Sequence, residues 1–183
     1  MYPFNLKMTT TKKSKGTNKI KGIVIHHTAW WTFASNMKYL SSSVAKSSVH
    51  FVIWEYEERG KIWDPKDILR HAGNWKRGDC QNCNTDFLWI EVVWYGEYNT
   101  KQLIALTDLV EYLMSVYNIP REMIIRHSDC TQDDERTKKK ILRDGFRRSK
   151  KKDIWIRFFP MWFETWRNQL TPREVSRYWC KNI

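Results

Sequence analysis

The stretch "KGIVIHHTAWW", residues 21–31, decides the fold, because an apolar run of β-branched residues leads directly into two adjacent histidines. A short run of this kind is typical of a strand buried in a sheet. Successive side chains of a strand point to opposite faces, so His26 and His27 do not serve the same site. The stretch predicts a central strand that carries one histidine to a site at its C-terminal end.

Three further segments share the short, β-branched or aromatic character of a strand. They are "HFVIWEY" (50–56), "LWIEVVW" (88–94) and "MIIRH" (123–127). In the second of them Glu91 alternates with apolar neighbours, which places Ile90 and Val92 on one face and Glu91 with Trp89 and Val93 on the other.

Two segments between the strands have helical spacing. Apolar residues recur at Phe33, Met37, Leu40 and Val44, and the stretch from Thr100 to Tyr117 has an apolar stripe at Leu103, Leu106, Val110 and Leu113. Thr100 is a suitable N-cap for the second helix, and Asn118 with Pro120 ends it. Strands separated by helices predict an α/β fold with a central mixed sheet flanked by helices.

The chain has 183 residues and a net charge of +12, which is enough length for one domain with its own core. Residues 1–21 hold six lysines and no acid, and residues 136–152 hold ten Lys or Arg against Asp144 alone. These two segments carry more positive charge than the whole chain, so the remainder is net negative. We interpret them as solvated segments, with attraction to a polyanion such as nucleic acid or an anionic cell wall as the functional alternative.

His127 ends a predicted strand just as His26 does, so the sheet can bring these two imidazoles together. A catalytic zinc site needs three protein ligands and one open position, and histidine with a carboxylate suits this metal. Isolated histidines at strand ends are more often structural, so the surrounding motifs decide the interpretation.

Five ordered motifs give the chain a resemblance to the zinc-dependent N-acetylmuramoyl-L-alanine amidases, which include phage lysins and peptidoglycan recognition proteins. The motifs are "IVIHHTA", "VHFVI", "ILRHAG", "CNTDFLWIEVV" and "IIRHSD", and they span residues 20–129 in the order of the family. The resemblance implies a single amidase-like domain at 20–160, between a basic flexible tail at 1–19 and a C-terminal extension at 161–183.

Carried over by position, the resemblance implies that His26 and His127 bind Zn²⁺ and that Glu91 is the general base. It implies substrate contacts for His50 and His71. For the third zinc ligand, "SKKKDIWIRFFP" resembles the family's ending, which points to Asp153 and makes residues 130–150 an inserted basic loop.

The same ending implies that Lys151 stabilises the oxyanion, since amide hydrolysis needs positive charge there. Cys130 and Glu135 are rivals for the third ligand position.

Tryptophan occupies several positions where the family has glycine, among them residues 30, 31, 54, 89, 94 and 155. The chain has eleven Trp and seven Gly, whereas glycine alone normally supplies about 7% of residues. We interpret many of these as UGA codons that the source organism reads as glycine. The alternative is a sugar-stacking aromatic surface.

The resemblance implies hydrolysis of the amide between N-acetylmuramic acid and L-alanine in peptidoglycan or muropeptides. The alternative is a module of the same fold that binds muropeptides without cutting them; a nucleic-acid-binding protein is a weaker third interpretation.

We expect a monomer with no obligatory nucleic acid. No apolar run reaches the roughly 20 residues of a membrane span, and we find no signal peptide. These features predict a cytoplasmic protein in the producing cell, with release to the cell wall as an option.

Overall fold

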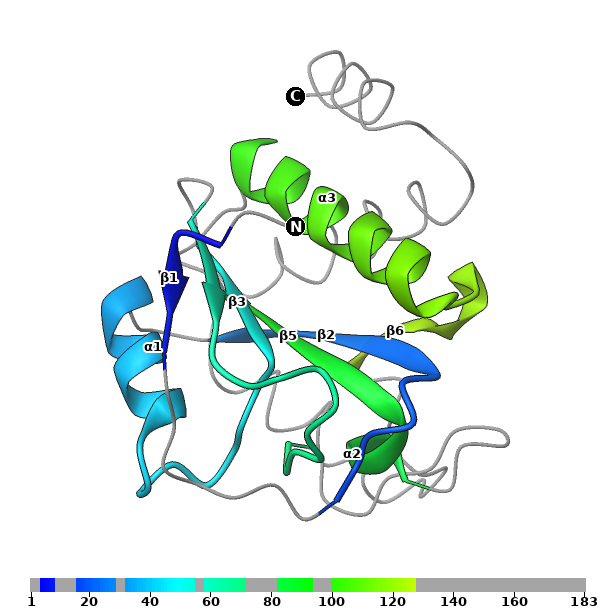
Figure 1. Ribbon diagram of the computed structural model, residues 1–183. Coiled ribbons are helices and arrows are strands. Elements are labelled where there is room, and N and C mark those ends of the chain that lie inside the picture. Colours follow the sequence, from blue (N-terminus) through cyan, green and yellow to red (C-terminus); the bar gives the residue numbers. More distant parts are fainter. Residues whose placement is uncertain are drawn as a thin grey trace, which may run out of the picture. The chain divides into compact units, whose positions relative to one another are not determined.

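The computed structural model describes residues 4–8, 16–28, 32–54, 58–71, 82–93 and 100–127, and within them six strands form one sheet (Figure 1). The strands are β1 Leu6–Lys7, β2 Gly22–Thr28, β3 Phe51–Ile53, β4 Arg59–Lys61, β5 Phe87–Val93 and β6 Ile124–Arg126. Their order is β1-β4-β3-β5-β2-β6. All neighbours are parallel except β3 and β4, which are antiparallel. The predicted α/β fold with a central mixed sheet is confirmed.

The centre of the sheet consists of β5 and β2. Every residue of β5 is buried, as are the first four residues of β2. Strands covered on both faces read as nearly continuous apolar runs, which is why these two segments were recognisable in the sequence. Their parallel register places His26 directly beside Glu91.

Helix α3, Thr100–Tyr117, lies over one face of the sheet (Figure 1), and the residues of its predicted apolar stripe are buried. It ends where the sequence predicted, because Asn118 takes a left-handed conformation with φ of 52°. The Ile119 N–H then donates to the Met114 carbonyl at 3.1 Å. This six-residue closure is the Schellman arrangement that satisfies helix-terminal carbonyls.

Helix α1, Phe33–Ser41, contributes Met37 and Leu40 to the core on the other face, together with side chains of β2, β3 and β5. It is shorter than its apolar spacing predicted. The Ser42 N–H donates to the Tyr39 carbonyl at 2.9 Å and ends the helix, so Val44 lies outside it and is 76% exposed.

Sequence patterns did not predict the shortest elements. These are β1, β4, α2 at Cys83–Asp86 and the 3₁₀ turn η1 at Arg121–Met123. Strand β1 falls within the segment predicted as a flexible tail, yet it pairs with β4 at the sheet edge. Elements of two to four residues are too short to show a period.

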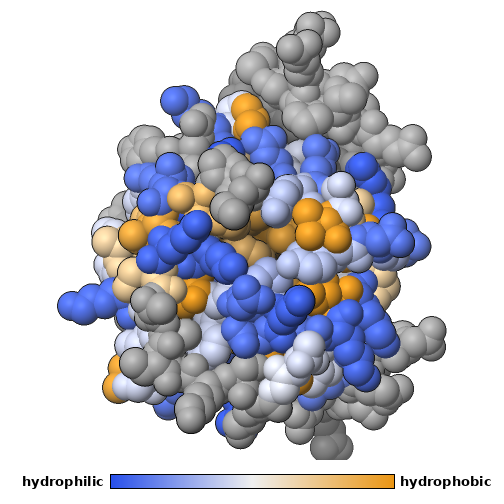
Figure 2. Space-filling model, in the orientation of Figure 1, coloured by the Kyte–Doolittle hydropathy of each residue, from blue (hydrophilic) through white to orange (hydrophobic). Residues whose placement is uncertain are grey.

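The described part of the chain has no helix with both the length and the apolar character to cross a membrane. Figure 2 shows one face of the molecule, on which hydrophilic side chains separate smaller hydrophobic groups.

Candidate metal centre

The candidate site begins with a contact between the two central strands. His26 extends from β2 and Glu91 from β5, and His26 Nδ1 lies 3.1 Å from Glu91 Oε1 and 3.2 Å from Oε2. Glu91 is 3% exposed. A buried carboxylate beside an imidazole is a strongly interacting pair, because little water screens the charge.

His127 joins this pair from the neighbouring strand. It follows β6 directly. Because β6 runs parallel to β2, the C-terminal ends of the two strands lie at the same end of the sheet. The ring centroids of His127 and His26 are 4.3 Å apart. The structure therefore places His26 close to His127, as the strand-end pattern predicted.

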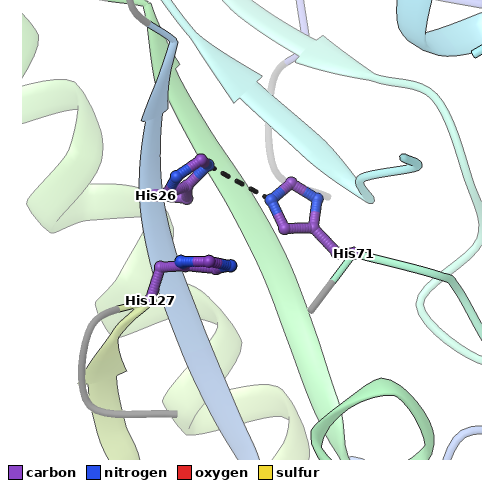
Figure 3. Close-up of side chains that lie close together, drawn as sticks. All are labelled: His26, His71 and His127. Atoms are coloured by element: carbon purple, nitrogen blue, oxygen red, sulfur yellow. Dashed lines mark hydrogen bonds between the residues drawn. The ribbon is translucent and has the colours of Figure 1, made fainter. Parts of the chain in front are cut away.

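His71 completes a cluster of three histidines (Figure 3). It lies in the segment that follows β4, and its Nε2 is 3.2 Å from His26 Nδ1 and 3.5 Å from a Glu91 carboxylate oxygen. Each of the three histidines offers a ring nitrogen, and these atoms all lie within 4.8 Å of one another. Sequence reasoning placed His71 in contact with substrate and did not predict that it would join the other two.

Three groups hold the His71 ring in place. Its Nδ1 lies 3.1 Å from the Ser48 carbonyl oxygen, and its backbone N–H donates to Asn84 Oδ1 at 2.9 Å. The indole of Trp89 stacks on the ring with centroids 4.6 Å apart and an interplanar angle of 23°. Two of these contacts involve backbone atoms, which are common to all residue types, so the sequence alone does not reveal them.

His50 lies apart from the cluster and has no exposed surface. Its Nδ1 accepts from the Trp89 N–H at 2.9 Å, and its Nε2 donates to the Asp67 carbonyl at 3.1 Å. Both ring nitrogens are thus engaged with backbone, which joins β5 to the segment after β4. These contacts fix the His50 ring between the two segments, and its contact with substrate stays a prediction.

The charges of the site depend on Glu91. Burial alone would raise its pKa, but the charge of His26 and the hydrogen bond to it outweigh burial, so the pKa of Glu91 lies below its usual value. Burial alone would lower the pKa of His26, but the nearby Glu91 reverses the effect and the pKa is raised. The described site therefore favours an ionised carboxylate beside His26.

The other two histidines of the cluster favour the neutral form. Burial, the largest cause, lowers the pKa of His71 and outweighs the attraction of Glu91. Burial also lowers the pKa of His127 to about 3, with repulsion from His26 and His71 adding to the effect. A neutral imidazole has a lone pair, which is the form in which histidine binds a metal.

This donor set fits a zinc ion. Three imidazoles converge from separate elements, and one of them is oriented through its second nitrogen by a backbone carbonyl, as is usual for metal-binding histidines. Glu91 adds a carboxylate at the same point. The cluster could hold zinc together with a water molecule.

Trp89 forms one wall of the cluster. It is fully buried, and its ring meets His127 edge-on with centroids 6.1 Å apart. Its Nε1 has no hydrogen-bond partner within the described residues. The sheet thus accommodates an indole at a position where the resemblance predicts glycine, and the codon interpretation stays a prediction.

Several predicted site residues lie outside the described residues. They are Lys151, Asp153 and the rival ligands Cys130 and Glu135. Among the tryptophans of the codon interpretation, those at 30, 31, 94 and 155 also lie outside. The described site therefore comprises three histidines, Glu91 and the Trp89 wall.

At this end of the sheet the buried carboxylate of Glu91 on β5 lies on one side of His26 on β2, and His127, which follows β6, lies on the other side. Residues 16–140 match the family model Amidase_2, described as N-acetylmuramoyl-L-alanine amidase. The chain belongs to this family. The search of curated proteins found no match to its sequence.

Solved structures of amidases and endolysins share the fold. PlyL is 19% identical with a TM-score of 0.59, covering 79% of this chain and 91% of its own. A mutant endolysin from Bacillus subtilis is 21% identical with a TM-score of 0.59, covering 80% and 97%.

AmpDh3 from Pseudomonas aeruginosa, solved in complex with anhydromuramic pentapeptide, is 22% identical with a TM-score of 0.53, covering 74% and 60%. At these identities the similarity establishes the fold alone.

Proposed function

We propose that the protein is a zinc-dependent hydrolase that cuts the amide between the lactyl group of N-acetylmuramic acid and L-alanine in peptidoglycan or its fragments. The observation that carries the proposal is the convergence of His26, His127 and the buried Glu91 at the C-terminal ends of the parallel strands. Family membership supports the amidase class, and the donor set supports the metal.

His26 and His127 would hold the ion at the ends of β2 and β6. Bound zinc supplies a Lewis acid for the scissile carbonyl and lowers the pKa of its water toward roughly 7. Both side chains come from parallel strands of one rigid sheet, so little of their position depends on loops.

Glu91 would act as the general base. Its carboxylate lies within 3.5 Å of His26 Nδ1 and His71 Nε2, so it borders the point where these nitrogens converge. Its lowered pKa keeps it ionised at neutral pH, ready to take a proton from the attacking water. It would then pass this proton to the departing amine of L-alanine, while the carbonyl carbon keeps the hydroxyl.

Two further roles come from the sequence resemblance. Lys151 would stabilise the negative oxygen that develops on the carbonyl, and Asp153 would be a third zinc ligand. Both residues lie outside the described part of the chain, so these roles stay predictions.

The test is product analysis by mass spectrometry after incubation of the zinc-loaded protein with a soluble muropeptide. We expect a peptide with a free L-alanine amine and the matching N-acetylmuramic acid fragment. The matched control is Glu91→Gln, which keeps the size of the side chain and removes its basicity; we expect its rate to fall at least about 100-fold.

Zinc binding with muropeptide binding but no cleavage would overturn the hydrolase and favour a muropeptide-binding module. Chelation should abolish cleavage, and added zinc should restore it. Cleavage that persists after complete zinc removal would contradict the metal-dependent mechanism.

A further inference from the structure

A cavity of about 350 Å³ lies between α3 and the edge of the sheet that β1, β4 and β3 form. Its walls include four aromatic rings, those of Phe4, Phe51, Tyr112 and Tyr117. The rings of Phe4 and Phe51 stack with centroids 5.4 Å apart and an interplanar angle of 8°. Ligand pockets typically measure about 300–1,000 Å³, so this volume suits one small ring-shaped ligand such as a single sugar unit.

The strand register places this cavity on the opposite face of the sheet from the metal centre. Glu91 of β5 is in register with Val52 of β3, so the two side chains point to the same face. Phe51 precedes Val52 and therefore points to the other face, which α3 covers (Figure 1). Leu113 of α3 lines the cavity together with Phe51. The sheet thus separates a ligand in the cavity from Glu91, and the cavity is a second site.

Two lysines lie side by side along one wall of the cavity. Lys7 of β1 is in register with Lys61 of β4, which is in turn in register with Phe51 of β3. All three residues line the cavity. Like charges directly opposite each other on neighbouring strands destabilise a sheet, and an anion beside them removes this cost. The row therefore offers positive charge next to an aromatic wall.

The described lining supplies a single carboxylate, Asp64, for these two ammonium groups. Asp64 accepts from Lys61 Nζ at 3.2 Å and from the Lys66 backbone N–H at 3.1 Å. Within the described part of the chain, no ion pair involves Lys7. Burial and repulsion from Asp64 raise the pKa of Tyr117, so its hydroxyl stays protonated and can donate a hydrogen bond. The cavity can thus offer an ammonium group and a hydroxyl donor to an anionic ligand.

We infer that this cavity binds a sugar that carries a carboxylate, which in peptidoglycan is N-acetylmuramic acid with a free lactyl group. Aromatic rings suit the apolar faces of a sugar ring, and the Lys7 ammonium suits the carboxylate. This inference rests on the proposed function, because hydrolysis of the amide is what frees the lactyl carboxylate. Water gives its hydroxyl to the carbonyl carbon and a proton to the departing amine, so the acid stays on the glycan. The cavity would retain the enzyme on glycan that it has already cut.

The experiment is an NMR titration of the zinc-loaded full chain with N-acetylmuramic acid and with N-acetylglucosamine, the matched sugar that lacks the lactyl carboxylate. We expect N-acetylmuramic acid to shift the amide signals of Phe51 and Leu113 to saturation. N-acetylglucosamine should bind at least about 10-fold more weakly, the effect expected when a hydrogen bond between charged groups is lost. Lys7→Gln should remove this difference. The matched control is Lys38→Gln, an exposed lysine of α1 on the other face, which should keep it.

Equal affinity of the parent for the two sugars would overturn the inference, as would an unchanged difference in Lys7→Gln. Shifts confined to the surroundings of His26 and His127 would also overturn it, because the sugar would then bind only at the metal centre. Cleavage of a soluble muropeptide by the parent tests the proposed function separately. Its absence would contradict that function, and the titration would still decide the ligand of the cavity.

Discussion

Acid sensitivity at His50 follows directly from its buried hydrogen bonds. Burial, the largest cause, lowers the pKa of His50 to about 3, against 6.5 for an exposed histidine. Protonation would also put a proton on Nδ1, which faces the N–H of Trp89, so two donors would oppose each other. The folded state therefore requires the neutral ring.

The sign and size of the effect follow from this difference. Between pH 6.5 and about pH 3 the unfolded chain binds a proton at His50 that the folded chain does not bind, so the free energy of unfolding falls as the pH falls. The loss approaches about 1.4 kcal/mol per pH unit once the unfolded histidine is mostly protonated, and it totals about 2.3 kcal/mol between pH 6.5 and about pH 4.5. The stability contributed by this residue is complete roughly one pH unit above 6.5.

The assay is guanidinium denaturation at several pH values in the presence of a chelator, which removes the effect of metal binding. The matched variant is His50→Gln, because an amide can accept from Trp89 and donate to Asp67 but does not titrate. We expect the parent to lose about 2.3 kcal/mol more than the variant over that range. Parallel loss of stability in the two proteins would refute the reasoning, as would an NMR titration showing a His50 pKa near 6.5.

Three further changes test the packing and electrostatics of the described residues. Gly22→Ala should lower the free energy of unfolding by roughly 1–3 kcal/mol in thermal denaturation, because a Cβ there would overlap the ring of Phe87; an unchanged midpoint would contradict this close approach. Trp89→Gly should lower it by about 3–5 kcal/mol, because a fully buried indole is removed, whereas an equal or higher midpoint would support glycine as the natural residue. Glu91→Gln should lower the pKa of His26 in the metal-free protein, as followed by NMR, since the carboxylate is what raises it; no change would show that Glu91 does not set this pKa.

The sequence predicted the centre of the fold well because its long elements have strong periods. Strands β2 and β5 carry apolar runs, and α3 has both an apolar stripe and a residue that can adopt the left-handed conformation at its end. The length of α1 was overestimated because Val44 continues the apolar spacing, whereas Ser42 closes the helix through its backbone. Apolar spacing indicates a face and does not reveal where a local hydrogen bond ends the helix.

The candidate site was partly predictable. His26 and Glu91 lie on adjacent strands and His127 follows β6 directly, so the sheet geometry brings the three residues together. His71 lies in an irregular segment, and its position depends on contacts with the Ser48 carbonyl and the Trp89 ring. Contacts between distant segments of this kind have no local sequence pattern.

The most direct test of the central claim is the amount of zinc bound per chain, measured for the purified parent and for His127→Ala. The strand-end arrangement predicts about one zinc per chain in the parent and little in the variant, because the loss of one histidine opens the metal site. A parent chain that binds no zinc when the metal is supplied would contradict the account.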